Sequence, residues 1–246
     1  MKRAIHITLL IIAVVLSIGL LLVGVGVGRA LQPDTVCTVL KYDISDSDKR
    51  LYLSEDELSS MLRAQDIYPI GKPLSHISTQ RIEDVVRSNP MVRTAECFAN
   101  PKGELCVSLT QRKPLLKVIT ADDSYIIDTD RRRMPIRNSI TDPMLVVIGR
   151  VGERMALTDI ADLAEWLYAN AYWQQRIKYM EVRTPRYVRL LPIDPQAEII
   201  VLGDLENYAD KLRKLKIYYE NSTQEVRDKQ YKELDLRFKG QVVGRK

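Results

Sequence analysis

The chain has 246 residues, of which 46% are hydrophobic and 28% are charged. This composition excludes a disordered protein and provides enough apolar residues for one domain of ordinary size or two small ones. The 37 basic residues exceed the 32 acidic ones by only five, and the most basic stretch is Arg131-Arg132-Arg133. Nucleic-acid-binding proteins usually carry a strongly basic patch, so we expect no nucleic-acid partner.

The N-terminal region is strongly apolar. After Lys2 and Arg3 the next charged residue is Arg29. Between them, the apolar stretch from Ile7 to Val27 would be about 32 Å long as a helix, enough to cross a hydrocarbon core. A cleaved signal peptide is the alternative, but its apolar region is shorter and Arg29 stands where small residues would precede the cleavage site. We therefore expect a cytoplasmic end at 1–3 and an uncleaved inner-membrane helix at 4–28, with the rest of the chain outside that membrane.

A small α+β unit is expected at 36–113. Ser54-Glu55-Asp56-Glu57 is a capping box that opens one helix, and a second helical pattern runs over 79–89 and ends before Pro90. Strand patterns lie before and after these helices, at 36–40, 91–99 and 104–112. The predicted order is strand, helix, helix, strand, strand, with both helices on one face of a three-stranded sheet.

The three cysteines fall in this unit. Cys97 and Cys106 flank the turn sequence Asn100-Pro101-Lys102-Gly103. If Ala99 pairs with Glu104 across that turn, Cys97 lies opposite Cys106. The two cysteines then form either a disulfide or two buried thiols. Cys37 is close enough in the predicted sheet to compete for either partner.

A β-rich unit with two helices is expected at 114–240, followed by a C-terminal tail at 241–246. In its last strand pattern Leu234, Leu236 and Phe238 alternate with charged residues, which predicts a sheet edge with one charged face. The strand patterns lie at 115–120, 125–128, 144–148, 177–182, 187–191, 198–202 and 231–238, and the helical patterns at 158–169 and after Asn207.

Catalytic chemistry is not indicated. His76 is the only imidazole outside the apolar N-terminal stretch, and no nucleophile motif or phosphate-binding glycine loop is present. We expect a binding protein that is not an enzyme and has neither a cofactor nor a metal. A cell-wall hydrolase is an alternative because two carboxylates would suffice, although no pair is singled out.

Five motifs follow one another in chain order. They are Asn89-Pro90-Met91-Val92-Arg93-Thr94-Ala95, Gln111-Arg112-Lys113-Pro114, Tyr125-Ile126-Ile127-Asp128 with Met134-Pro135, Leu202-Gly203 with Lys211-Leu212, and Glu233-Leu234-Asp235-Leu236-Arg237-Phe238. Together they resemble the bacterial division family FtsQ/DivIB, and their form resembles versions from the Bacteroidetes.

The resemblance implies a non-enzymatic divisome scaffold. It implies a transmembrane helix, a POTRA domain that supports recruitment to the septum, and a β domain that binds the bitopic proteins FtsB and FtsL. The partner's segment would add as a strand at the terminal edge, a mode called β-augmentation. The residues expected at this surface are Arg237, Phe238, Gly240 and Val242.

Departures from the family pattern and an alternative function accompany the resemblance. Arg245 stands where the family pattern has a contacting Trp, so the charge of the contact surface is expected to differ. The alternative is a periplasmic POTRA-containing assembly factor or chaperone, although those proteins carry several such units or a large barrel.

Overall fold

The computed structural model of the chain describes residues 35–45, 52–194, 198–223 and 231–246. The predicted membrane helix at 4–28 and the cytoplasmic end before it lie outside the described residues. Among the helices that are described, none has both the length and the apolar character to cross a bilayer.

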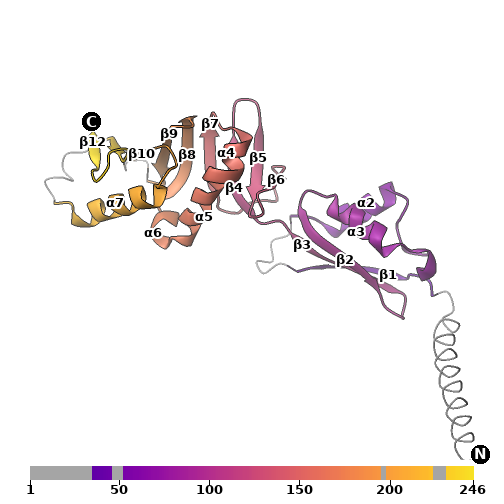
Figure 1. The fold of residues 1–246 in the computed structure, drawn as a ribbon. Coiled ribbons are helices and arrows are strands. Elements are labelled where there is room, and N and C mark those ends of the chain that lie inside the picture. Colours follow the sequence, from indigo (N-terminus) through magenta and orange to yellow (C-terminus); the bar gives the residue numbers. More distant parts are fainter. Residues whose placement is uncertain (1–34, 46–51, 195–197, 224–230) are drawn as a thin grey trace, which may run out of the picture. The chain divides into compact units, whose positions relative to one another are not determined.

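The first part of the chain forms a three-stranded sheet with two helices on one face (Figure 1). The strand order is β1-β3-β2, so the last strand in sequence is central. The predicted order of strand, helix, helix, strand, strand is confirmed. The elements are β1 (Val39–Ile44), α2 (Glu55–Ala64), the 3₁₀ turn η1 (Leu74–His76), α3 (Thr79–Arg87), β2 (Val92–Ala99) and β3 (Glu104–Gln111).

Local sequence signals explain both helices. The backbone N–H of Glu57 donates to Ser54 Oγ at 3.1 Å, which caps the start of α2 as predicted. Leu58 and Leu62 are buried one turn apart in α2, and α3 buries Ile82 and Val86 in the same way. This i, i+4 spacing gives each helix one apolar face to pack on the sheet.

The hairpin between β2 and β3 has a different register from the one predicted. The backbone N–H of Asn100 donates to the carbonyl of Glu104 at 2.9 Å, and the side-chain hydroxyls of Thr94 and Thr110 are 2.6 Å apart. Pairing therefore begins at Asn100 rather than at Ala99. A shift of one residue moves every side chain of one strand to the other face.

This shift separates the two cysteines that were predicted to face each other. Val107 now lies opposite Cys97; both are buried, whereas Cys106 is half-buried on the other face. All three cysteines are free thiols. The Cys97–Cys106 disulfide, one of the two expected alternatives, is therefore absent from the structure, because the one-residue shift in register places the two side chains on opposite faces of the sheet.

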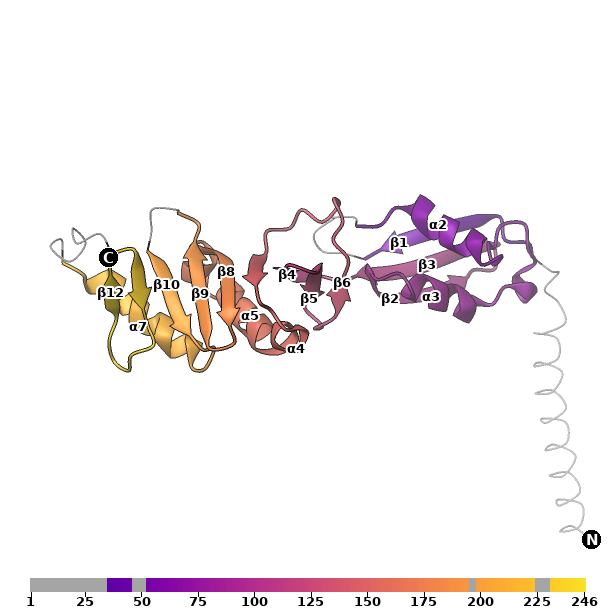
Figure 2. The ribbon, with the colours of Figure 1, turned by 90° about the horizontal axis from the view of Figure 1, so that it is seen from above.

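The second part of the chain forms a nine-stranded mixed sheet with its helices on one face (Figures 1 and 2). The strand order is β12-β11-β10-β9-β8-β7-β4-β5-β6. The strands are β4 (Pro114–Ile119), β5 (Ser124–Asp128), β6 (Arg133–Met134), β7 (Leu145–Gly149), β8 (Ile177–Thr184), β9 (Tyr187–Pro192), β10 (Ile199–Gly203), β11 (Glu233–Asp235) and β12 (Val243–Arg245). The helices are α4 (Glu153–Met155), α5 (Ala161–Ala169), α6 (Ala171–Gln174) and α7 (Tyr208–Asn221), with the π-helical turn η2 (Ala156–Ile160) joining α4 to α5.

The core lies between the sheet and these helices. The predicted apolar stripe of the first long helix is confirmed, since Ile160, Leu163, Ala164 and Leu167 are all buried. That helix begins earlier than predicted, after Gly152. α7 contributes the buried side chains of Leu212 and Leu215, and the sheet contributes residues from seven of its strands, including Leu116, Val147, Met180, Val188, Leu190, Ile200 and Leu234.

Candidate functional site

The C-terminal end of the sheet is built by three short strands. β11 lies parallel to β10, and β12 returns antiparallel to β11 with Val243 opposite Asp235. β12 is therefore the last strand on this side. The prediction that 231–238 would form this edge is wrong, because β11 covers only Glu233–Asp235 and the expected tail at 241–246 contains the edge strand.

Phe238 lies in the loop between β11 and β12. Strand alternation would place it with Leu234 and Leu236, which are buried as predicted. The strand ends at Asp235, however, and the chain then turns at Gly240 with a left-handed φ of +73°. Phe238 is consequently 45% exposed instead of packing in the core with the two leucines.

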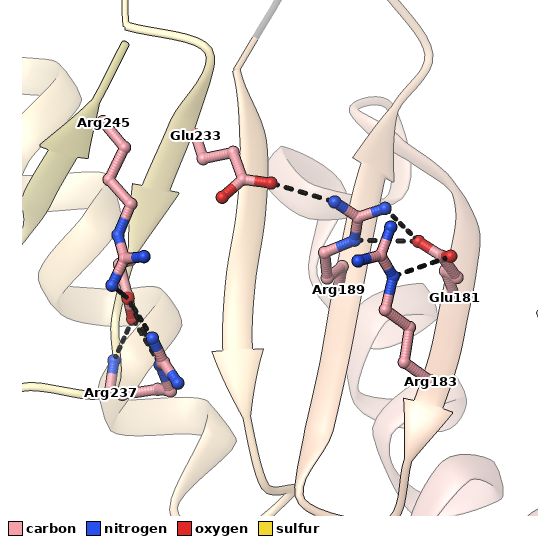
Figure 3. Close-up of polar contacts among 7 residues, drawn as sticks. Glu181, Arg183, Arg189, Glu233, Arg237 and Arg245 are labelled. Atoms are coloured by element: carbon pink, nitrogen blue, oxygen red, sulfur yellow. Dashed lines mark hydrogen bonds and ion pairs between the residues drawn. The ribbon is translucent and has the colours of Figure 1, made fainter.

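Asp235 is a fully buried carboxylate between two arginines, Arg237 and Arg245, which Figure 3 labels. Its side chain is 0% exposed. Arg237 donates to it through the backbone N–H at 3.1 Å, through Nε at 2.9 Å and through Nη2 at 2.6 Å, and Arg245 donates from the edge strand through Nη2 at 2.7 Å. One carboxylate thus connects the loop that carries Phe238 to β12.

These contacts keep Asp235 and Arg237 charged. Burial by itself raises the pKa of Asp235, but the hydrogen bonds from Arg237 and the positive charges of Arg237 and Arg245 outweigh it, so the pKa lies below its ordinary value. The hydrogen bond to Asp235 in turn raises the pKa of Arg237. The pair remains ionised in the neutral pH range.

Arg237 lies across the end of β10, and part of its side chain stays exposed. A Cβ placed on Gly203 would be 2.6 Å from Arg237 Cγ, so only glycine leaves room for this side chain. The guanidinium then reaches the ring of Tyr187 on β9, with its carbon 5.3 Å from the ring centroid. The position of Arg237 therefore depends on residues from three strands.

A second polar cluster covers the neighbouring strands (Figure 3). Arg189 on β9 donates to Glu181 on β8 and, at 2.9 Å, to Glu233 on β11. Glu181 also accepts from Arg183 at 3.1 Å. Because β10 lies between β9 and β11, Arg189 connects strands that are not adjacent, and it covers Val201, its buried partner in the register.

A basic hollow of about 570 Å³ lies between α7 and the loop after β11. Lys214 on α7 donates to the carbonyl oxygens of Leu236 at 3.3 Å and Phe238 at 2.7 Å, which fixes the loop against the helix. Burial and the nearby charge of Lys211 lower the pKa of Lys214. The hollow is lined by Asn207, Asp210, Lys211, Lys214, Leu236, Arg237, Phe238, Lys239 and Gly240.

Three of the four predicted surface residues meet at this hollow. Arg237, Phe238 and Gly240 line it, whereas Val242 is partly buried and packs against the core of the sheet. Sequence reasoning missed the buried Asp235 and the supporting lysine, Lys214. A signal for the first was present, because a carboxylate between two leucines in a strand, followed by arginines, is unusual unless it is paired.

In the described ranges, no group of three or more His, Cys, Asp or Glu side chains could hold a metal ion.

The two parts of the chain match two known families. The family described as "FtsQ/DivIB, C-terminal related" matches residues 113–245, more than half of the chain, and the POTRA-like domain family matches residues 35–110. The chain belongs to the FtsQ/DivIB family. Its domains indicate a division-associated scaffold; the family consists of division-site membrane proteins and is generally non-enzymatic.

One curated relative is more distant. The chain is 23% identical over 123 residues to a protein named tRNA pseudouridine synthase B from Ureaplasma urealyticum serovar 10, and the match covers 48% of this chain and 52% of the relative. The chain thus spans about half the length of that relative. A similarity this low and partial gives no ground for transferring the relative's activity.

Proposed function

We propose that this protein is a non-enzymatic divisome scaffold that binds FtsB- and FtsL-type bitopic proteins through the C-terminal edge of its β domain. Residues 4–28 would anchor it in the inner membrane, with the N-terminus in the cytoplasm and most of the chain in the periplasm at the division septum. In this role it helps to assemble septal peptidoglycan synthesis.

The observation that carries the proposal is the combination of an edge strand with an exposed aromatic residue beside it. Among the described strands, β12 is the outermost on this side of the sheet and so presents one side to an incoming strand. Strand addition obtains affinity from main-chain hydrogen bonds and specificity from side-chain pockets along the strand. The exposed ring of Phe238 and the basic hollow next to it supply such a pocket.

The four predicted residues have different roles in this proposal. Phe238 offers an apolar contact, and aromatic side chains commonly dominate binding energy at interfaces. Arg237 contributes positive charge at the hollow, and Gly240 allows the turn that returns the chain to the edge. Val242 supports β12 from the core side.

The test is binding of the full 246-residue chain in lipid nanodiscs to the periplasmic segments of FtsB-like and FtsL-like proteins from the same bacterium. We expect Phe238→Asp to weaken binding about tenfold or more, because it replaces an apolar anchor by a charge. The chain contains only one other Phe, Phe98, which is 55% exposed in the three-stranded sheet. Phe98→Asp is therefore the matched control and should bind like the wild type.

Each result has a definite meaning once circular dichroism shows that both variants are folded. Loss of binding in Phe238→Asp alone supports a partner at the C-terminal edge. Equal binding by both variants would place the contact surface elsewhere on the scaffold. An absence of binding by the wild type would contradict the scaffold proposal and return attention to the assembly-factor alternative.

A further inference from the structure

The edge strand has few other attachments to the domain. β12 consists of three residues and pairs only with β11 among the described strands. Val242, the residue that precedes β12, packs against the core, and Gly244 within β12 lies against the ring of Tyr231. A strand of this length makes few main-chain hydrogen bonds, so a side-chain contact contributes a large share of what holds it in place.

Asp235 supplies the negative charge that balances the positively charged C-terminal segment at 236–246. Residues 236–246 contain Arg237, Lys239, Arg245 and Lys246 and no carboxylate side chain. The nearest other acid on β11, Glu233, is engaged by Arg189 at 2.9 Å. Asp235 accepts from an arginine on each side of the turn, at 2.6 Å and 2.7 Å. Without its charge, these two guanidinium groups would repel each other across the turn.

We propose that Asp235 is a positioning residue for partner binding: it holds Arg237 and the edge strand β12 in the arrangement that an incoming strand meets, without touching the partner itself. This inference rests on the proposed function. It extends that function because the residue that holds the binding edge in place is fully buried. A partner therefore cannot contact it.

The variant Asp235→Asn tests this role, because it keeps the size of the side chain and removes the charge. We expect it to bind an FtsB-like periplasmic segment about tenfold or more weakly than the full-length wild type. Hydrogen exchange at residues 241–245 should become faster, while exchange in β4 and β7 stays unchanged. The second measurement reports on the edge strand directly and needs no partner.

Glu181→Gln is the matched control. Glu181 also accepts hydrogen bonds from two arginines on the same sheet, Arg183 and Arg189, but it lies on β8, away from the edge. A general loss of stability would speed exchange throughout the sheet, β4 and β7 included, and not at residues 241–245 alone. The positioning role predicts that Glu181→Gln leaves partner binding and exchange at 241–245 as in the wild type.

A double substitution separates positioning from simple destabilisation. Arg245→Gln should weaken binding in the wild type but add little to Asp235→Asn, because both changes remove the same contact. Additive effects would overturn the inference, as would wild-type binding and exchange in Asp235→Asn. If the wild type fails to bind while exchange at 241–245 still responds to Asp235→Asn, the proposed function fails. Asp235 then stabilises the edge strand but has no role in partner binding.

Discussion

Asp235 and Glu181 show how a sheet can stabilise carboxylates at two different degrees of burial. Removing a carboxylate from water is costly unless hydrogen bonds replace its hydration. Asp235 is completely buried and receives hydrogen bonds from Arg237 and Arg245, whereas Glu181 is only partly buried. The loss of one partner is therefore expected to cost more at Asp235, where water cannot take its place.

Gly244 provides a test of packing at the same edge. A Cβ at this position would lie 2.5 Å from the ring of Tyr231, a distance shorter than Cβ contacts in real proteins. We expect Gly244→Ser to lower the free energy of unfolding by about 1–3 kcal/mol, as overpacking commonly does. Urea unfolding followed by circular dichroism measures this change.

The control for that measurement is Gly152→Ser. A Cβ on Gly152 meets no atom within 4 Å, and serine is favoured at the position before a helix. This variant should be as stable as the wild type. An equal loss in both variants would show that the ring of Tyr231 does not restrict residue 244.

At the scale of elements, the two sheets protect their edges in different ways. β2 is an outer strand of the three-stranded sheet, and its Cys97 N–H donates to the Glu83 carboxylate of α3 at 2.9 Å. β12 is instead very short and carries Arg245, followed by Lys246. Short strands and cations discourage pairing between identical copies, and under the proposed function this edge accepts a strand from a different chain.

The register of β2 and β3 predicts the reactivity of the cysteines. Burial raises the pKa of Cys97 to about 12, and the nearby carboxylate of Glu83 contributes to this increase. Burial also raises the pKa of Cys37. Because the thiolate is the reactive form, iodoacetamide at pH 8 should label the half-buried Cys106 well before the other two.

Peptide mass spectrometry of the timed reaction checks this order. Unfolding without a reductant should then make all three cysteines available for labelling. A disulfide-linked peptide containing Cys97 and Cys106 would contradict the register, and Cys106→Ser is the control that removes the fast reaction.

At the scale of the whole molecule, long periodic elements could be predicted from the sequence and short ones could not. The stripe from Ile160 to Leu167 marked a helix because several apolar residues recur at helical spacing. α6 and β12 have only four and three residues, too few to show a period. The contacts of Asp235 depend on the pairing of β10, β11 and β12 and on the space above Gly203, which local sequence does not encode.

The paired carboxylates also predict how stability depends on pH. The pKa values of Asp235, Glu181 and Asp204 are all lowered; burial opposes the shift at each of them, and their hydrogen bonds to arginine or lysine outweigh it. A carboxylate with a lowered folded pKa stabilises the protein above its unfolded pKa, and this stabilisation is lost as the pH falls through the folded value. We therefore expect the free energy of unfolding to decrease below about pH 4.

Comparison of the wild type with Asp235→Asn isolates the contribution of one group. The variant lacks the charge at every pH, so the stability difference between the two proteins should be constant at neutral pH and should shrink as Asp235 in the wild type becomes protonated. Its ordinary pKa of 3.8 sets the upper limit of that window. Urea unfolding at pH 7, 5 and 3 measures the difference. If it stays the same at all three, the ionised carboxylate is not what stabilises the edge, because the stability difference would then not depend on the charge of Asp235.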